Sequence, residues 1–280
     1  MKKIITLIIC FSIIFMFGAC NNNNTPDSGS NLESSVKIAG EDVKYIRTGP
    51  AKYFTLSFDD GSTEDDKLIA LLKKYNVKCT FNINTGLLND FGAITVSGYY
   101  PRYQYDVVKN GVYDGFEVAV HTLSHISLIQ CEKDEVIKQV RKDSDNILTL
   151  TNIKPIGMAY PGGSDCYDEN TVKIILENTN IRYARTTTET GNFGIPTSFM
   201  NWNPTCGALN ANLSTLAEQF VSAKPSSDML FYVWGHSWEI TANNKWTDFE
   251  EFLKTVSGKE DIVYITNAEF YQLFKTEISK

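Results

Sequence analysis

Histidines and clustered basic residues are scarce in this sequence, and both shortages restrict its function. Its 26 lysine and arginine residues are outnumbered by 33 aspartate and glutamate residues, and they are scattered along the 280-residue chain. A chain with a formal net charge of −7 and no basic cluster does not collect phosphates, so we expect no nucleic-acid partner. There is no internal repeat, and the absence of an HExxH motif disfavours zincin-type peptidase chemistry.

The N-terminal segment has little in common with the rest of the chain. Two lysines precede an apolar run over residues 4–17, and Gly18-Ala19-Cys20 follows it. This order is typical of a secretory signal peptide rather than a membrane span. Small residues before a cysteine also resemble a bacterial lipobox, although Phe17 stands where leucine is usual. We therefore expect residues 1–19 to be removed and Cys20 to carry a lipid, giving an exported bacterial lipoprotein anchored to a membrane or the cell surface; simple secretion is the alternative.

The chain after the lipobox is expected to hold a tether and one domain. Residues 20–35 contain almost no apolar side chains and cannot bury a core, which predicts a flexible tether. No linker-like segment interrupts the chain further on, so we expect a single domain over residues 36–280, beginning with a short strand or hairpin.

The cysteines that remain after export are few and lack zinc-finger spacing. Cys79 lies in an apolar run and is expected to be a buried thiol. Cys166 and Cys206 lie in segments with glycine or proline, and a disulfide between them is left open because an oxidising compartment would permit it.

Short β-rich runs alternate with amphipathic stretches from residue 53 onward. We expect strands over residues 53–58, 78–83, 116–120, 155–160, 181–187, 229–234 and 261–265. Helices are expected over residues 64–75, 133–150, 169–178, 211–223, 247–256 and 267–277. Strand–helix alternation of this kind predicts an α/β fold with a parallel sheet, either open or closed into a barrel.

Polar side chains follow the ends of several predicted strands, where the functional groups of parallel α/β folds gather. The first strand runs directly into Asp59-Asp60-Gly61. A turn at the glycine would let both carboxylates enter one site, where a cation or hydrogen bonds must offset their repulsion. An Asp-Asp-Gly sequence is also a common turn, so this motif alone does not decide between a site and a turn.

The three histidines of the chain all follow predicted strands. His121 and His125 come after the third strand, and His236 comes after the sixth. Two imidazoles four residues apart can lie on one side of a helical turn and bind one metal ion, and nitrogen ligands suit Zn²⁺. Isolated histidines are more often solvated or hydrogen-bonded, but the shared position at strand ends favours a metal site.

These ordered segments resemble the motifs of the polysaccharide deacetylase family, also called carbohydrate esterase family 4 or the NodB-homology domain. Ser57-Phe58-Asp59-Asp60-Gly61 matches the first motif, and His121-Thr122-Leu123-Ser124-His125 matches the second. The likeness covers about residues 52–270. It implies a single catalytic domain folded as a distorted (β/α)7-type barrel. The implied activity is metal-dependent removal of acetyl groups from N-acetylated polysaccharides or oligosaccharides, with O-acetylated xylan as a secondary substrate class.

The resemblance also assigns roles to individual residues. It implies a divalent metal ion, Zn²⁺ by preference with Co²⁺, Mn²⁺ and Ni²⁺ compatible, bound by Asp60, His121 and His125. Asp59 would take the proton of the attacking water, and His236 would protonate the leaving amine. The oxyanion would be stabilised by the metal and by the backbone N–H of Gly162.

Two of the family's motifs are altered in this chain. The third motif often carries an arginine that orients the catalytic aspartate, but Ala159 stands in its place, as in a subgroup with an Ala-Tyr-Pro sequence. Arg185 on the next predicted strand is a candidate replacement, with a purely structural arginine as the equal alternative. The carboxylates of the fourth motif have no counterpart, since the nearest segment is Asn201-Trp202-Asn203. Glu239 could orient His236, bind a sugar hydroxyl, or simply lie exposed.

Aromatic side chains stack on sugar rings, and all four tryptophans lie in the last third of the chain, so Trp202, Trp238 and Trp246 could line a glycan groove. Core packing is the alternative for each of them. Trp234 stands where the family usually has an aliphatic residue of the acetyl pocket. The candidates for contact with the glycan are Tyr160, Pro161, Trp202, Trp234, Trp238 and Glu239.

We therefore expect an exported metal-dependent deacetylase whose partners are an acetylated glycan and, through the lipid anchor only, a membrane. A lipid-anchored glycan-binding protein without turnover on the same scaffold is the alternative, but such a protein would not need a base, an acid and a metal site together. A metal hydrolase with another substrate, such as a peptidase or a lactamase, is the third hypothesis.

Overall fold

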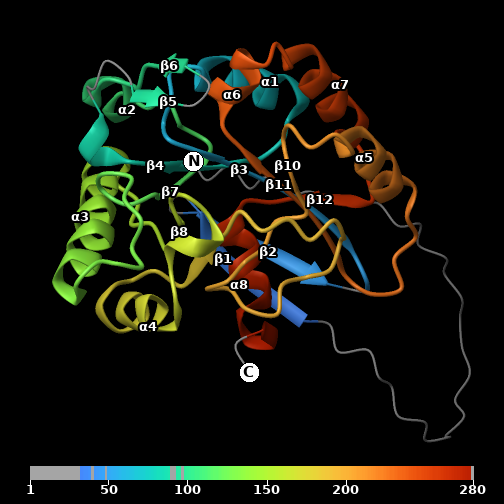
Figure 1. The fold of residues 1–280 in the computed structure, drawn as a ribbon. Helices are drawn as coiled ribbons and strands as arrows, with labels where there is room; N and C mark the ends of the chain where they lie inside the picture. Colours follow the sequence, from blue (N-terminus) through green and yellow to red (C-terminus); the bar gives the residue numbers. More distant parts are fainter. Residues whose placement is uncertain (1–31, 39–40, 48, 89–92, 96–97, 279–280) are drawn as a thin grey trace, which may run out of the picture. The chain divides into compact units, whose positions relative to one another are not determined.

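A computed structural model describes residues 32–38, 41–47, 49–88, 93–95 and 98–278 of the chain (Figure 1). The strands are β1 (Leu32–Ile38), β2 (Glu41–Arg47), β3 (Lys52–Asp59), β4 (Thr80–Ile83), β5 (Ala93–Thr95), β6 (Gly98–Tyr100), β7 (Glu117–Val120), β8 (Gly157–Ala159), β9 (Tyr183–Arg185), β10 (Cys206–Gly207), β11 (Met229–Gly235) and β12 (Ile262–Tyr264). The α-helices are α1 (Asp65–Tyr75), α2 (Tyr105–Lys109), α3 (Lys133–Thr151), α4 (Glu169–Asn178), α5 (Leu213–Ser222), α6 (Ser237–Ala242), α7 (Trp246–Val256) and α8 (Asn267–Ile278). Within the described ranges, no helix combines the length and apolar character that a membrane span requires.

Eight parallel strands form the central sheet, in the order β10-β11-β3-β4-β7-β8-β9, with β12 paired to β3. β11 pairs with β3 along its length, whereas β12 pairs with residues 52–54 and β4 with residues 57–59. The seven strands and six helices expected from the sequence are all present. The expected distorted barrel is thus confirmed as a curled half-barrel of parallel strands with surrounding helices, in one domain.

An irregular segment, residues 199–205, lies between β9 at one end of the strand order and β11 near the other. The N–H of Ala184 donates to the carbonyl of Phe199 over 2.8 Å, and the N–H of Thr205 donates to the carbonyl of Tyr232 over 2.8 Å. Backbone hydrogen bonds therefore connect both sides of the half-barrel through a loop rather than through a further regular strand, which accounts for the distortion of the barrel.

Side chains of β3 alternate between two environments. One set packs into the main apolar cluster, and it consists of Phe54, Leu56 and Phe58. The other set faces inward and is polar: Thr55 donates a hydrogen bond to Asn267 (2.9 Å), and Ser57 accepts one from Asn82 (2.8 Å). Because successive residues of a strand point to opposite faces, Asp59 at the end of β3 belongs to the inward set.

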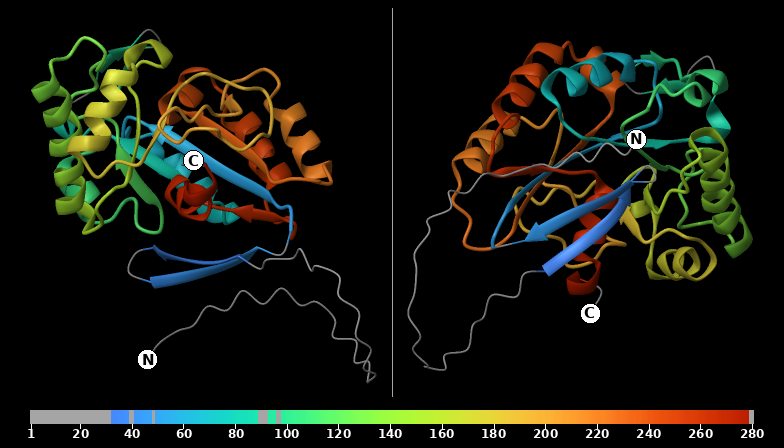
Figure 2. Two further views of the ribbon diagram at one scale, coloured as in Figure 1. Left: turned by 90° about the horizontal axis from the view of Figure 1, so that it is seen from below. Right: turned by 180° about the vertical axis from the view of Figure 1, so that it is seen from behind.

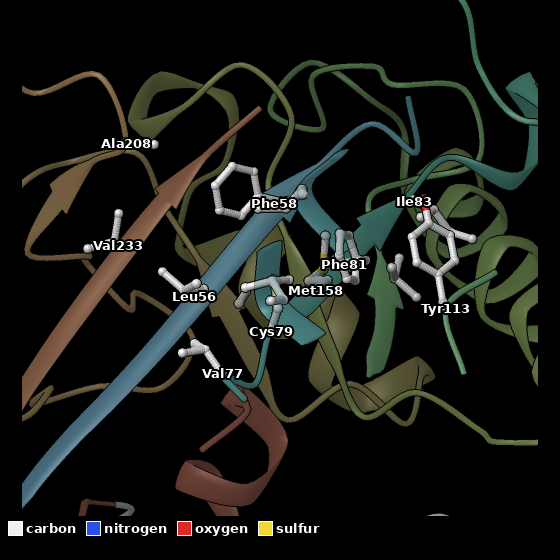
Figure 3. Packing of buried hydrophobic residues seen from close by; sticks show 14 of the residues in the cluster. Leu56, Phe58, Val77, Cys79, Phe81, Ile83, Tyr113, Met158, Ala208 and Val233 are labelled. Carbon is white, nitrogen blue, oxygen red and sulfur yellow. The ribbon is translucent and has the colours of Figure 1, made fainter. Parts of the chain in front are cut away.

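The main apolar core contains these three apolar side chains of β3 and apolar side chains of the neighbouring strands, as Figure 3 shows. Phe81 of β4, Met158 of β8 and Val233 of β11 are all fully buried there, and Phe58 meets Phe249 of α7 edge-on with ring centroids 5.7 Å apart. Figure 1 shows α1, α5 and α7 along one part of the sheet and α3 and α4 along another. Burial of one such side chain stabilises the fold by roughly 1.5–3 kcal/mol, so this core fixes the strand ends that carry the polar groups.

β1 and β2 form an antiparallel hairpin ahead of β3 (Figure 2), in keeping with the expected hairpin near the start of the domain. β1 begins at Leu32 and so takes in residues 32–35 of the segment expected to be a tether. Strand pairing uses backbone groups, which polar residues supply as well as apolar ones, so composition placed that boundary too late. Cys20 and the expected signal peptide lie outside the described residues.

Candidate active site

The carboxyl ends of four parallel strands bring distant polar residues together. Asp59 ends β3, His121 follows β7, Arg185 ends β9 and His236 follows β11. Parallel strands present their carboxyl ends at the same edge of a sheet, and the alternation of side chains aims these residues at its inner face. The site is therefore built from the sheet itself and not from a single loop.

Asp60 leaves β3 in a backbone conformation that few side chains adopt. Its φ is 84°, and that of Gly61 is 67°. The expected turn at the glycine thus begins one residue earlier, and the left-handed conformation at Asp60 lets two consecutive carboxylates face one site. Two hydrogen bonds hold this peptide: the N–H of Asp60 donates to the carbonyl of Asn82 (2.9 Å), and Arg102 donates to the carbonyl of Asp60 (3.1 Å).

Asp60, His121 and His125 form a compact set of potential metal ligands. Oδ1 of Asp60 lies 3.4 Å from Nε2 of His125 and 3.7 Å from Nε2 of His121. Two ligands that are each about 2.1 Å from a tetrahedral Zn²⁺ lie about 3.4 Å apart, so this spacing suits one shared ion. In the described part of the chain, Oδ1 of Asp60 is buried and receives no hydrogen bond. A buried carboxylate oxygen without a donor is costly, so two imidazoles and this oxygen fit a divalent metal ion.

The charges around this set favour the ligand forms. Burial alone would raise the pKa of Asp60, but the charges of His236, His121, His125 and Arg102 outweigh it and lower that pKa well below its ordinary value. Burial lowers the pKa of His121 to about 4, so its imidazole is neutral near pH 7. An ionised carboxylate and a neutral imidazole are the forms that bind metal ions.

His121 is oriented by hydrogen bonds at its ring and its backbone. Its Nδ1 lies 2.9 Å from the carbonyl oxygen of Ala159, which only accepts, so Nδ1 carries the proton and Nε2 keeps its lone pair for the site. The N–H of His121 donates to Asp143 (3.0 Å), and Asn84 donates to the carbonyl of His121 (2.5 Å). Burial raises the pKa of Asp143 to about 7.

The segment from His121 to His125 corrects one expectation from the sequence. It is not a helical turn: Thr122 has a φ of 63° and His125 a φ of 54°, both in the left-handed region. These two reversals, rather than helical periodicity, bring the imidazoles together with ring centroids 4.9 Å apart. The prediction that the two rings lie close together is therefore confirmed, but the helical turn given as its cause is wrong.

Both oxygens of Asp59 have buried hydrogen-bond donors. Asn82 donates to Oδ1 over 2.8 Å, and Arg185 forms an ion pair with Oδ2. The side chains of Asp59 and Arg185 are 2% and 0% exposed. Arg185 thus contacts the carboxylate that the missing third-motif arginine would orient. Asn82 was missed, although a polar residue between Phe81 and Ile83 in an apolar strand was a usable signal.

His236 has a carboxylate partner that follows it on α6. Nδ1 of His236 donates to Oε2 of Glu239 over 2.9 Å, and Nε2 lies 3.9 Å from Asp59 and 3.8 Å from Asp60. Burial disfavours the cation, but the bond to Glu239 and the charges of Asp60 and Asp59 outweigh this effect and raise the pKa of His236 to about 9. The imidazole is therefore protonated near neutral pH and can donate a proton from Nε2.

The segment Asn201-Trp202-Asn203 does not supply this partner. Asn201 bonds with Tyr167, and Asn203 bonds with Thr186. Glu239 reaches the histidine because three residues along the start of α6 return its side chain to the same side.

The loop that carries Gly162 follows β8. Gly162 has a φ of 78°, and a Cβ atom there would lie 2.7 Å from Sγ of Cys166. The expectation that the Tyr160 side chain contacts substrate is wrong, because that side chain is buried, stacks on Tyr167 at 4.0 Å and donates to the carbonyl of Met200. Pro161 is buried as well, so this loop offers its backbone rather than these side chains.

Three of the tryptophans expected to contact the glycan, Trp202, Trp234 and Trp238, have different environments. Trp202 is 0% exposed and packs against Tyr232 in a second apolar cluster, so its assignment to a glycan groove is wrong. Trp234 is half-buried at the site, where the Arg185 guanidinium lies 4.7 Å from its ring centroid. Trp238 donates from its indole N–H to Asp60, a contact that its expected role did not include. Their sequence positions alone could not separate these environments.

The cysteines in the described part of the chain are all free thiols, so Cys166 and Cys206 are not joined. Cys79 is buried as expected, and burial raises its pKa well above the ordinary value. At the candidate site, the side chain of His125 is 35% exposed and that of His236 is 16% exposed.

Residues 46–184 match the family model described as Polysaccharide deacetylase. A Geobacillus stearothermophilus protein, described as an uncharacterized 30.6 kDa protein in the fumA 3' region, is 28% identical over 133 residues, which are 47% of this chain and 44% of that protein. This chain thus spans less than half the length of that relative.

Two solved structures extend the comparison. A Streptococcus pyogenes deacetylase in complex with acetate is 27% identical, over 52% of this chain and 61% of that chain, with a TM-score of 0.43. A putative polysaccharide deacetylase from Mycobacterium smegmatis is 12% identical, over 82% of this chain and 92% of that chain, with a TM-score of 0.58. The second likeness extends the shared fold across most of the chain.

Proposed function

Because residues 46–184 match the Polysaccharide deacetylase family model, we propose that this chain removes acetyl groups from N-acetylated polysaccharides or oligosaccharides by metal-dependent hydrolysis. One observation carries the proposal: Oδ1 of Asp60, which accepts no hydrogen bond from the described residues, lies beside the Nε2 atoms of His121 and His125. A second carboxylate and a protonated imidazole stand next to this set. A binding protein without turnover would have no use for that acid–base pair.

Asp60, His121 and His125 would hold the metal ion, with Zn²⁺ as the first choice for two imidazoles and a carboxylate. When bound, such an ion supplies Lewis acidity and lowers the pKa of water to about 7. Three protein ligands leave room for water and for the carbonyl group of a substrate.

Asp59 is the general base of this proposal. Its carboxylate is held at both oxygens by Asn82 and Arg185, so it is oriented before substrate binds. It removes a proton from the water that adds to the acetyl carbonyl carbon. The backbone N–H of Gly162 stabilises the negative charge that forms on the carbonyl oxygen.

His236 completes the reaction as the general acid. Glu239 holds its Nδ1, which leaves the Nε2 proton for the nitrogen of the leaving group. The carbon–nitrogen bond breaks as that nitrogen is protonated, which releases acetate and a free amine. Glycan contacts are assigned to the half-buried Trp234 beside this acid, since its ring lies 5.6 Å from that of His236.

Export and a lipid anchor at Cys20 belong to the same proposal, on the basis of the apolar run over residues 4–17 and the small residues before the cysteine. Expression of the full chain with a labelled fatty acid tests this part. The label should appear in the wild type and be absent from Cys20→Ser, and equal labelling would contradict the anchor.

Acetate release from a panel of acetylated glycans tests the activity. We expect release after the metal-stripped full chain is resupplied with Zn²⁺ or Co²⁺, and none from the stripped protein. Tight metal binding with no acetate from any glycan or small acetyl ester would favour a glycan-binding protein instead.

A further inference from the structure

The two oxygens of the Asp60 carboxylate have different surroundings. Oδ2 accepts hydrogen bonds from the indole Nε1–H of Trp238 and from the hydroxyl of Tyr100, both over 3.0 Å. Oδ1 receives no hydrogen bond from the described residues and faces the imidazoles of His121 and His125. One oxygen is thus held by two donors, and the other remains for a cation.

Trp238 and Tyr100 form a rigid pair although they come from different parts of the chain. Their rings are stacked, with centroids 4.5 Å apart and planes 3° from parallel. Trp238 lies in the first turn of α6, and Tyr100 ends β6. Stacking fixes both donors at once, and it covers one face of the indole.

Arg102 directs the proton of the Tyr100 hydroxyl. The buried guanidinium donates to that hydroxyl oxygen over 3.2 Å and to the backbone carbonyl of Asp60 over 3.1 Å. Since the oxygen of Tyr100 accepts from Arg102, its single proton is free to bond with Asp60. Arg102 lies 3.6 Å from Oδ1, which is too far for a hydrogen bond.

We propose that Trp238 and Tyr100 are positioning residues that hold Asp60 as a single-oxygen metal ligand. By occupying Oδ2 they leave Oδ1 alone to face the ion and keep the carboxylate from turning both oxygens toward it. A two-oxygen carboxylate would use a further coordination position, and that position is the one that water and substrate need. This inference rests on the proposed metal site, although it does not depend on which glycan is the substrate.

The test is the affinity of the full chain for Zn²⁺, measured by competition with a chromophoric chelator. Trp238→Phe and Tyr100→Phe each keep an aromatic ring for the stack and remove one donor to Oδ2. We expect each to weaken Zn²⁺ binding by about 10-fold to 100-fold, as is usual when a partner of a metal ligand is lost.

The chain offers matched controls for both substitutions. The Trp246 indole donates to Thr241 (2.8 Å), and the Tyr103 hydroxyl donates to Asp66 (2.6 Å), and neither partner belongs to the metal set. Trp246→Phe and Tyr103→Phe should therefore keep wild-type Zn²⁺ affinity. Circular dichroism checks folding, and if one of the site variants does not fold, the other still decides.

Wild-type Zn²⁺ affinity in a folded Trp238→Phe or Tyr100→Phe variant would overturn the inference, and so would equal weakening in the control variants. Acetate release is measured separately. If the wild type binds Zn²⁺, loses affinity in both site variants and yet releases no acetate, the proposed function fails while the role of Trp238 and Tyr100 stands.

Discussion

Arg185 at the end of β9 forms a buried ion pair with Asp59 at the end of β3, across 126 residues of sequence. Its guanidinium also lies over the ring of Trp234. Ala159 stands where the resembling third motif often carries an arginine, and the cation that pairs with Asp59 comes instead from β9. If Asp59 is the proposed base, Arg185 supplies the charge that orients it.

Loss of this cation should damage both stability and turnover. Arg185→Gln leaves Asp59 buried without its countercharge, so we expect the free energy of unfolding to fall by about 3–5 kcal/mol. Acetate release should fall about 100-fold in the folded fraction, because the base is no longer held in place. Urea unfolding and acetate assays measure the two effects. The exposed Arg182, in Arg182→Gln, is the control. A lower free energy of unfolding with unchanged acetate release in the folded fraction of Arg185→Gln would show a merely structural arginine.

The dependence of activity on pH should report on His236 and Glu239. The raised pKa of His236, about 9, means that the imidazole holds its proton below that pH and loses it above, so activity should fall as the pH rises through that range. Glu239→Gln removes the charge that favours the cation. We expect the alkaline limb of kcat to move about one pH unit lower. If the alkaline limb of kcat does not move in Glu239→Gln, His236 is not the general acid.

Substitutions of Asp59 and His125 should affect turnover and metal binding differently. Asp59→Asn removes the base and keeps the metal ligands, so acetate release should fall by about 100-fold to 10,000-fold while Zn²⁺ affinity is retained. His125→Ala removes a ligand, so Zn²⁺ affinity itself should fall. Chelator competition and acetate assays on the same preparations give both values. Loss of Zn²⁺ binding in Asp59→Asn would contradict the division of roles between the two aspartates.

If the backbone N–H of Gly162 stabilises the oxyanion, Gly162→Ala should lower acetate release by more than backbone strain alone would. Gly162→Ala places a Cβ against Sγ of Cys166 at a φ of 78°, which should shift the loop. We expect acetate release to fall by about 100-fold, as for loss of one oxyanion donor, with Zn²⁺ affinity unchanged. Gly191→Ala is the control, since Gly191 has a φ of 65° and nothing within 4 Å of the added Cβ. Equal losses in both variants would assign the defect to strain.

The local sequence determined the elements of this fold to within a few residues. Strand and helix periodicities depend on neighbours along the chain, so β3, β4 and β11 and the helices between the strands could be placed without any tertiary information. The convergence of Asp59, His121 and His236 also followed, because parallel strands end at one edge of a sheet.

Only the tertiary structure decided which side chains pair. Arg185 meets Asp59, Glu239 meets His236 and Trp238 meets Asp60 because of strand order, register and the start of α6. Tryptophan is a residue type that often stacks on sugar rings, but Trp202 is buried because its loop runs between β9 and β11. Periodicity fixes the face on which a side chain lies, whereas its partner depends on elements that are distant in the chain and that only packing brings together.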